Sequence, residues 1–146
     1  MKSLLRPLRQ VLVFAVALGC AAPALAQPRQ VDQENLYRYW ILLNTSVTMS
    51  APNSGLNLEA PGCAAVTYTI GSDGVPRDVT VAKLVPKSDL AMVARSAVSQ
   101  FRYGPSLTNR VGDPVSTYYV VPFNAPTDAA QRKQLLQACE LPGFGA

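Results

Sequence analysis

The feature that most constrains this chain is a pair of alternating runs joined by a turn. From Cys63 onward, hydrophobic residues recur at every second position: Ala64, Val66, Tyr68, Ile70. Period-two alternation of this kind predicts a β-strand with one buried face. Gly71-Ser72-Asp73-Gly74 is a turn sequence, and the alternation resumes after it at Val79 and Val81. We therefore expect an antiparallel β-hairpin.

A helix and a third strand are predicted after the hairpin. Ser88 is suited to cap the helix and Asp89 to lie in its first turn. Apolar residues then follow one helical stripe: Leu90, Val93, Ala94, Ala97, Val98, Phe101. Gly104-Pro105 would end this helix, because proline cannot continue it. A third alternating run, Val115–Phe123, predicts the last strand, with Tyr119 and Val121 on one face and Tyr118 and Val120 on the other.

These elements predict an α+β fold, in which a three-stranded antiparallel sheet carries a helix on one face. We expect two further helices, one from Asp32 to about Leu43 and one from Thr127 to about Cys139. The spacing of Leu36, Tyr39, Trp40 and Leu43 gives the first helix a packing face, or alternatively an exposed Tyr/Trp docking face. We expect four parts: an N-terminal leader (residues 1–26), a helix and loop (27–62), the α+β domain (63–125), and a C-terminal helix and tail (126–146).

The first 26 residues are typical of a secretory signal peptide. Three basic residues, Lys2, Arg6 and Arg9, precede the short apolar run Val11–Gly19, and Ala24-Leu25-Ala26 is a suitable cleavage site. We expect cleavage before Gln27. Two alternatives remain open: a lipoprotein acylated at Cys20, which follows Leu18-Gly19, and an uncleaved inner-membrane anchor.

Removal of the signal peptide changes the charge. The chain has 13 basic and nine acidic residues, a net charge of +4; three of the basic residues lie in the signal, which leaves ten against nine, or +1. We therefore expect no nucleic-acid partner. The chain has no histidine, which excludes Ser-His-Asp and Cys-His catalysis and histidine-containing metal sites.

Two cysteines, Cys63 and Cys139, remain in the exported chain. Two cysteines in an oxidising compartment most simply form one disulfide, which would close a loop of about 77 residues and stabilise the fold by about 4 kcal/mol. The alternative is a redox or metal pair, but the cysteines lack the C-x-x-C spacing and further ligands that such a pair needs.

Candidate chemistry is otherwise sparse. Asp73 and Asp78 flank the hairpin turn, and a turn role accounts for Asp73. The residues between them do not supply the alternating oxygen ligands of a calcium loop. The sequence contains no S-x-x-K, G-x-S-x-G or glycine-rich phosphate loop. We therefore expect no enzyme activity, no catalytic residue, no metal, no cofactor and no small-molecule substrate.

Over roughly Cys63–Ala125 the chain resembles the C-terminal domain of the TonB energy-transducer family. The resemblance rests on the order and spacing of six pieces: Val66-Thr67-Tyr68-Thr69-Ile70, Asp73-Gly74-Val75-Pro76-Arg77-Asp78-Val79, the helical residues Ala94, Ala97 and Val98, Phe101-Arg102-Tyr103-Gly104-Pro105, Asn109-Arg110-Val111-Gly112-Asp113-Pro114-Val115 and Val120-Val121-Pro122-Phe123. The chain departs from the family where Cys63-Ala64-Ala65-Val66 replaces the usual Gly-x-Val start. Since an anchor carrying a histidine and a long proline-rich spacer are also lacking, we expect a stand-alone, exported, periplasmic form.

The resemblance implies a protein partner. In the family, a short N-terminal box of an outer-membrane transporter pairs as a strand beside the last strand, which here implies partner binding by Ser116, Thr117, Tyr118, Tyr119, Val120 and Val121. Arg102 is a further candidate, opposite an acidic partner group, or else a solvated helix end. The alternative function is an envelope structural or assembly protein that binds peptidoglycan or forms a homodimer, with Tyr37, Tyr39 and Trp40 as contacts.

Overall fold

The computed structural model describes residues 26–44 and 46–145. The predicted leader, up to Leu25, and Cys20 with its alternative lipid modification lie outside the described residues. Among the helices of the described ranges, none is long and apolar enough to cross a membrane.

The predicted hairpin forms the centre of the fold. Strands β3 (Gly62–Ile70) and β4 (Pro76–Val85) pair antiparallel, with Val66 opposite Val81. The turn between them is closed by hydrogen bonds from the Gly71 N–H to the Val75 carbonyl and from the Gly74 N–H to the Gly71 carbonyl, at 3.1 and 2.8 Å. Gly74 has φ +75°, and a Cβ there would lie 2.0 Å from the Tyr103 carbonyl oxygen, so only glycine fits this turn.

The central helix is shorter than the apolar stripe from Leu90 to Phe101 predicts. It forms α1 (Ala91–Ser99), and Leu90 rather than Ser88 stands at its N-cap. The Ser88 hydroxyl instead accepts a hydrogen bond from the Leu90 N–H at 3.3 Å, which makes a local turn before the helix. The predicted stripe is correct, because Val93, Ala94, Ala97 and Val98 are its buried residues.

Strand β6 (Val115–Phe123) has the predicted bounds and pairs antiparallel with β3, from Gly62 opposite Phe123 to Ile70 opposite Val115. The sheet is nevertheless larger than predicted. A fourth strand, β1 (Arg29–Gln30), pairs parallel with the start of β6, and the strand order is β1-β6-β3-β4. Two residues are too few to give an alternation that sequence reading would recognise; the edge of β6 holds them in place. The α+β class is confirmed, and the three-stranded sheet is corrected to four strands.

The predicted helix from Asp32 to Leu43 is wrong. This segment forms a short 3₁₀ turn, η1 (Leu36–Arg38), followed by strand β2 (Trp40–Leu42), which pairs antiparallel with β5 (Tyr103–Pro105). The Asp32 carboxylate accepts hydrogen bonds from the backbone and side chain of Asn35, which favours a turn over a helix start. Leu36 and Trp40 are buried as the spacing predicts, but Leu43 is 64% exposed.

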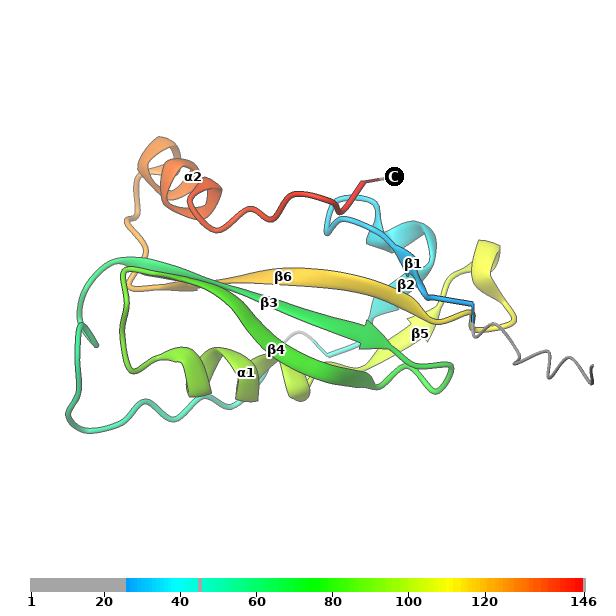
Figure 1. The fold of residues 1–146 in the computed structure, drawn as a ribbon, viewed down its shortest axis with the longest axis horizontal. Coiled ribbons are helices and arrows are strands. Elements are labelled where there is room, and N and C mark those ends of the chain that lie inside the picture. Colours follow the sequence, from blue (N-terminus) through cyan, green and yellow to red (C-terminus); the bar gives the residue numbers. More distant parts are fainter. Residues whose placement is uncertain (1–25, 45, 146) are drawn as a thin grey trace, which may run out of the picture.

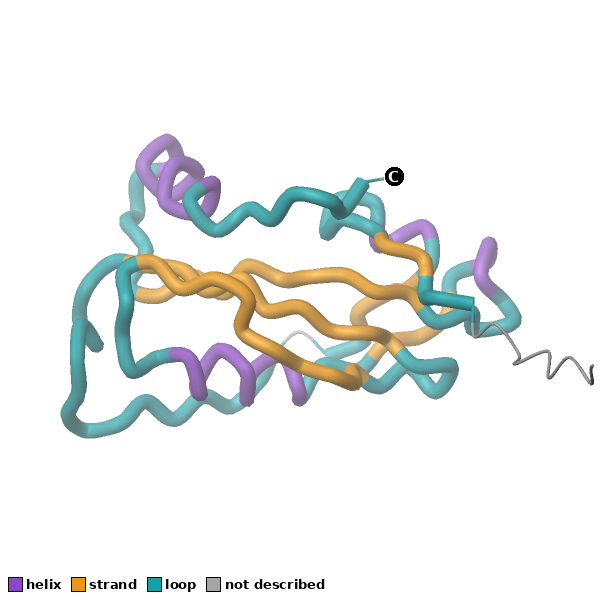
Figure 2. The backbone as a smooth tube through the Cα atoms, viewed as in Figure 1, coloured by secondary structure: helices purple, strands orange, loops and turns teal. Residues whose placement is uncertain are grey.

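The sheet lies between two layers, as Figures 1 and 2 show: α1 covers one face, and a C-terminal helix with the tail covers the other. This helix, α2 (Ala129–Gln137), begins at Asp128, whose carboxylate accepts a hydrogen bond from the Gln131 N–H at 2.8 Å. A disulfide joins Cys139, just after α2, to Cys63 in β3. The cystine is buried in a small second core with Ala65 and Tyr118.

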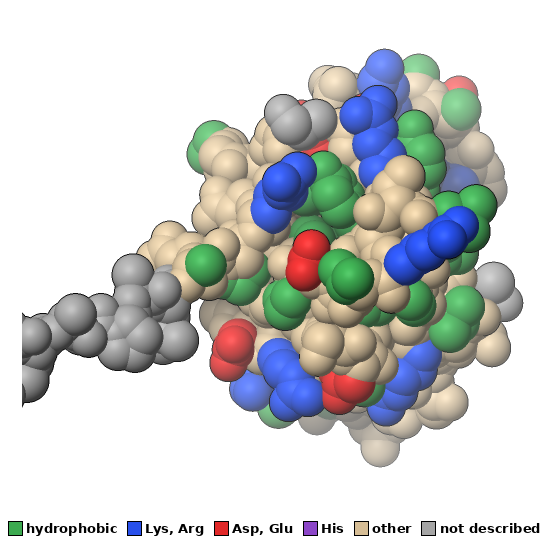
Figure 3. Space-filling model, turned by 90° about the vertical axis from the view of Figure 1, so that its right-hand side faces the viewer, with side chains coloured by type: hydrophobic (Ala, Val, Ile, Leu, Met, Phe, Trp, Pro, Cys, Tyr) green, Lys and Arg blue, Asp and Glu red, His purple; other side chains and the backbone are tan. Residues whose placement is uncertain are grey.

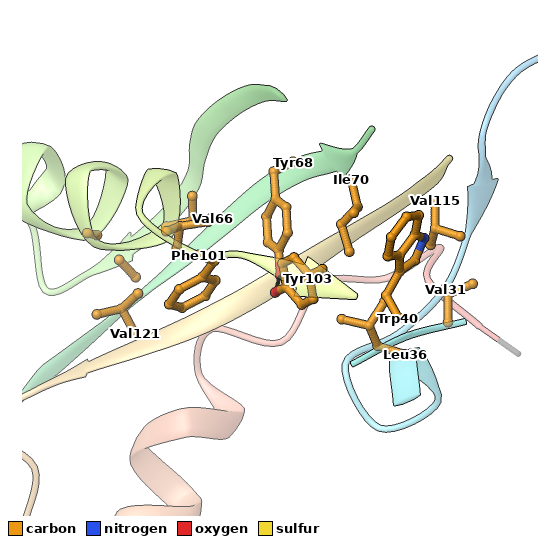
Figure 4. Packing of buried hydrophobic residues seen from close by; sticks show 13 residues of the cluster. Val31, Leu36, Trp40, Val66, Tyr68, Ile70, Phe101, Tyr103, Val115 and Val121 are labelled. Atoms are coloured by element: carbon orange, nitrogen blue, oxygen red, sulfur yellow. Dashed lines mark hydrogen bonds between the residues drawn. The ribbon is translucent and has the colours of Figure 1, made fainter. Parts of the chain in front are cut away.

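The main core on the α1 face is centred on three aromatic rings, Tyr68, Phe101 and Tyr103, which Figure 4 shows grouped beside the sheet. The hydroxyls of Tyr68 and Tyr103 share a hydrogen bond of 2.6 Å. Burial raises the pKa of Tyr68 well above its ordinary value and raises the pKa of Tyr103 to about 12. Both phenols are therefore neutral donors and acceptors inside the core at physiological pH.

Candidate functional site

The edge of β6 is only half covered. A strand directs the backbone N–H and C=O of successive residues to opposite sides. The Ser116 carbonyl accepts the Val31 N–H at 2.9 Å on the β1 side, so the backbone groups of Tyr118, Val120 and Pro122 also face away from β3. These three residues lie beyond the end of β1. Proline lacks an N–H, so Pro122 is suited to an edge position, and the half-open edge offers two N–H and three C=O groups.

One of these groups already has a substitute partner. The Val120 N–H donates a hydrogen bond to the side-chain oxygen of Gln33, at 3.3 Å. A carboxamide oxygen is chemically close to the backbone carbonyl that a neighbouring strand would present. Gln33 therefore occupies a position that a bound strand would fill. An incoming strand must displace this side chain to pair with Val120.

A groove of about 630 Å³ borders this half of the edge. Tyr118 and Val120 line its floor. One wall belongs to α2 and includes Arg132, Lys133 and Leu136; the other belongs to the turn after β1 and includes Asp32, Gln33 and Glu34. The groove thus places Tyr118, Val120 and charged residues of both signs, Glu140 included, beside an edge that no strand covers within the described residues.

The six predicted strand residues divide between two faces. Tyr118 and Val120 line the groove, and the Tyr118 ring packs against Phe144 with ring centroids 5.0 Å apart. Thr117, Tyr119 and Val121 are directed to the α1 side: Thr117 and Val121 are buried there, and the Tyr119 ring meets Phe101 edge to face. Ser116 is engaged by β1 and by a hydrogen bond to the Thr69 hydroxyl.

Arg102 does not line the groove. It follows α1, and its guanidinium donates hydrogen bonds to the carbonyl oxygens of Ser99 and Phe101, at 3.1 and 2.6 Å. A cation in contact with the last carbonyls of a helix offsets the negative end of the helix dipole. Its geometry therefore matches the helix-end role, and partner contact by Arg102 stays a prediction.

Sequence reasoning did not find Gln33, Arg132, Lys133 or Leu136 as site residues. Gln33 reaches β6 from the turn after β1, which is paired there, and α2 lies over the sheet through the disulfide and the packing of Leu136 on the second core. The available signal was modest: Arg132, Lys133 and Leu136 are spaced for one side of the predicted helix.

The remaining polar residues do not form a catalytic site. Asp73 forms an exposed ion pair with Arg77 at 2.8 Å, and the Val75 N–H donates to its carboxylate, which lowers the pKa of Asp73. Asp78 has φ 54° at an irregularity of the β3–β4 ladder, a conformation that aspartate tolerates better than most residues. Over residues 26–44 and 46–145, no group of three or more Cys, Asp or Glu is placed to hold a metal ion.

A second hollow, of about 660 Å³, lies at the far end of the molecule beside β2. Its lining is mostly apolar and includes Tyr37, Ile41 and Leu107, all of which are exposed. Leu107 begins a 3₁₀ turn, η2 (Leu107–Asn109), that packs near η1. Figure 3 looks at this end and shows hydrophobic side chains lying among Lys and Arg side chains.

An α+β module whose sheet ends in a half-open strand, bordered by a groove, belongs to the class of domains suited to binding extended segments of other proteins. The family model for the Gram-negative bacterial TonB protein C-terminal matches residues 52–124, half of the chain, and the chain belongs to this family. The predicted resemblance is thereby confirmed.

Domains of this family are non-enzymatic, lie in the periplasm of Gram-negative bacteria and interact with proteins such as outer-membrane transporters. The fold is also similar to the solution NMR structure of the Pseudomonas aeruginosa TonB C-terminal domain, with 20% identity and a TM-score of 0.45 over 68% of this chain and 97% of that one. A search among curated proteins finds no match.

Proposed function

We propose that this protein is a periplasmic TonB-like binding domain that captures an extended peptide of an outer-membrane transporter as an added strand. The observation that carries the proposal is the half-open edge of β6, where Tyr118, Val120 and Pro122 direct backbone groups away from β3. Strand addition gains main-chain hydrogen bonds there, and the neighbouring groove can contact alternate side chains of the guest. The proposed site is therefore the second half of β6, since β1 occupies the first.

The experiment is a pull-down of envelope proteins with the exported protein, compared between wild type, Val120→Pro and Val120→Thr. Proline removes the one edge N–H that Gln33 now occupies and leaves the β3 ladder intact. Threonine keeps that N–H and the β-branched shape, so it is the matched control. We expect wild type and Val120→Thr to retain a TonB-dependent transporter and Val120→Pro to lose it. Recovery of only cell-wall fragments or of the protein itself would overturn the proposal.

The second candidate function, self-association or assembly in the envelope, is favoured by the exposed apolar hollow beside β2. Ile41 and Leu107 are 45% and 81% exposed there, and burial of such side chains between two copies would be favourable. Sedimentation velocity decides this candidate. If the protein self-associates, we expect a wild-type dimer that the double variant Ile41→Ser, Leu107→Ser converts to a monomer. A wild-type monomer at all concentrations would exclude this candidate function.

A further inference from the structure

The exposed large hydrophobic side chains are concentrated at one end of the molecule, beside β2. Six of the nine such side chains in the described residues lie in the two segments 36–44 and 101–112: Tyr37, Ile41, Leu42, Leu43, Leu107 and Val111. Leu107 and Val111 are the most exposed, at 81% each. Single exposed apolar residues are ordinary on a protein surface, but a cluster of this kind marks a face that a partner covers.

The two segments form one folded base. Strands β2 and β5 pair antiparallel, and the pairing continues past both ends of these strands. At one end the Ser106 N–H donates a hydrogen bond to the Tyr39 carbonyl at 3.0 Å. At the other end the Leu43 N–H donates to the Arg102 carbonyl at 2.8 Å. Trp40 buries the inner side in the main core, so the exposed face is built on paired backbone and a buried tryptophan.

This end of the molecule is also basic. The segments 36–44 and 101–112 contain no Asp or Glu and three arginines, Arg38, Arg102 and Arg110. A further arginine, Arg29, lies over the ring of Tyr39 at 5.4 Å from its centroid, and its guanidinium donates a hydrogen bond to the Tyr39 hydroxyl at 2.8 Å. Figure 3 shows Lys and Arg side chains around the hydrophobic ones at this end.

The neighbouring acidic residues leave this positive charge in place. Asp32 and Glu34, which precede the first segment, line the groove beside β6 instead. Asp113 comes two residues after Val111 and borders the face on one side. In residues 26–44 and 46–145 the one ion pair joins Asp73 to Arg77, so Arg38 and Arg110 have no carboxylate partner there. The face therefore combines exposed apolar side chains with arginines that an anion can neutralise.

We propose that this end of the molecule docks on an anionic lipid surface. Arg38 and Arg110 meet the phosphate headgroups, and Leu107 and Val111 enter the interfacial layer. Tyr37 suits the boundary, because a tyrosine has an apolar ring and a polar hydroxyl. The inference goes beyond the proposed function, since the hollow beside β2 and the groove beside β6 share no lining residue.

A lipid surface fits this face better than a second copy of the chain does. In a two-fold dimer the same patch faces itself, so Arg38 and Arg110 of one copy would approach those of the other. A layer of anionic headgroups neutralises the same side chains. The described chain also begins at this end, because Arg29 comes three residues after Ala26 (Figure 1). A leader that remained attached would therefore join the protein beside this face.

Co-sedimentation with vesicles tests the docking. The exported protein is mixed with vesicles of phosphatidylcholine alone, or of equal parts of phosphatidylcholine and phosphatidylglycerol. We expect at least about tenfold stronger partition onto the anionic vesicles at low salt, and a smaller difference as salt screens the charges. Val120→Pro should bind the vesicles as wild type does, so this result and the transporter pull-down can fail separately.

A first pair of variants tests the charge of the face. The double variant Arg38→Gln, Arg110→Gln should lower the partition onto anionic vesicles about tenfold, because each arginine near an anionic surface contributes to binding. Lys83→Gln, Arg95→Gln is the matched control, since it makes the same change in net charge on β4 and α1. This control should retain most of the binding.

A second pair tests the apolar side chains. Leu107→Ser, Val111→Ser should also lower the partition about tenfold, because it removes the side chains that enter the interfacial layer. Leu56→Ser, Met92→Ser removes two side chains that are likewise exposed, at 57% and 70%, but lie outside the two segments. It should bind as wild type does. Circular dichroism checks that each variant folds.

Equal partition onto the two kinds of vesicle would overturn the docking on anionic lipid. An equal loss of binding in the face variants and in their controls would also overturn it, because the effect would then not belong to this face. Binding to neither kind of vesicle would do the same. A dimer in sedimentation velocity that Leu107→Ser, Val111→Ser dissociates would in that case assign the face to a second copy.

Discussion

Thr117 is a buried polar residue without a partner. Its side chain is fully buried on the α1 side of β6, and its hydroxyl has no hydrogen-bond partner within the described ranges. A buried unsatisfied hydroxyl costs free energy that an apolar group of the same shape does not. We expect Thr117→Val to raise the free energy of unfolding by about 1 kcal/mol, measured by urea denaturation. Thr117→Ser, which keeps the hydroxyl and removes a methyl, is the control and should destabilise the protein.

Gln33 makes a contact that competes with binding. Since its side chain accepts the Val120 N–H, a guest strand must break that hydrogen bond before it can pair. We expect Gln33→Ala to bind an extended partner segment a few-fold more tightly than wild type, because a neutral hydrogen bond is worth about 1 kcal/mol. Gln134→Ala makes the same change at an exposed position of α2 that does not line the groove, and it should bind as wild type does. Weaker binding by Gln33→Ala would show that the side chain supports the guest.

At the level of elements, the disulfide attaches α2 to the sheet. The bond links Cys63 and Cys139, which are 76 residues apart in the sequence. None of the residues of α2 is buried. Its position over β6 therefore depends strongly on this bond. We expect the double variant Cys63→Ser, Cys139→Ser to lose about 2–5 kcal/mol of stability in denaturant unfolding. It should also bind an extended partner segment more weakly even below its melting temperature, and unchanged binding would show that α2 is held by packing alone.

The elements that can be predicted from the sequence are those long enough to show a repeating pattern of hydrophobic residues. β3, β4 and β6 each have nine or ten residues, and α2 has a clear capping residue in Asp128. The two- and three-residue strands β1, β2 and β5 have no such signal, because each is defined by the edge it meets. The apolar spacing of Leu36 and Trp40 suits a helix as well as a turn followed by a strand.

The candidate site, whose binding role stays a prediction, could be located from the sequence only as far as its strand. The family resemblance pointed to β6, and Tyr118 and Val120 do line the groove. Nothing in the sequence indicated that β1 would cover the start of that edge or that Gln33 would reach Val120, since both depend on contacts between segments more than 80 residues apart. Pattern reading finds the strand, and the tertiary fold decides which half of it is open.

For the molecule as a whole, the buried tyrosine pair makes stability depend on alkaline pH. The pKa of Tyr103 is about 12 and that of Tyr68 is raised well above its ordinary value, while both ionise near pH 10 in the unfolded chain. The folded state therefore retains protons that the unfolded state loses. Stability should be unaffected by these groups below about pH 10 and should fall as pH rises toward 12.

Thermal unfolding followed between about pH 8 and pH 11 measures this effect. Tyr68→Phe removes one of the two phenols, so its melting temperature should fall less steeply with pH than that of wild type, although it starts lower because the hydrogen bond to Tyr103 is lost. Tyr37→Phe changes an exposed phenol and should keep the wild-type slope. Equal slopes for all three proteins would contradict the prediction.

The cross-link between Cys63 and Cys139 also has a consequence in time. If the chain is exported from its N-terminus, β6 leaves the cytoplasm before Cys139 does, because Cys139 follows β6 in the sequence. The bond can then form only after the segment through Cys139 has reached an oxidising compartment. A reduced chain would present the edge of β6 without a covalent link between α2 and the sheet. The groove beside β6 would therefore be complete only after this oxidation.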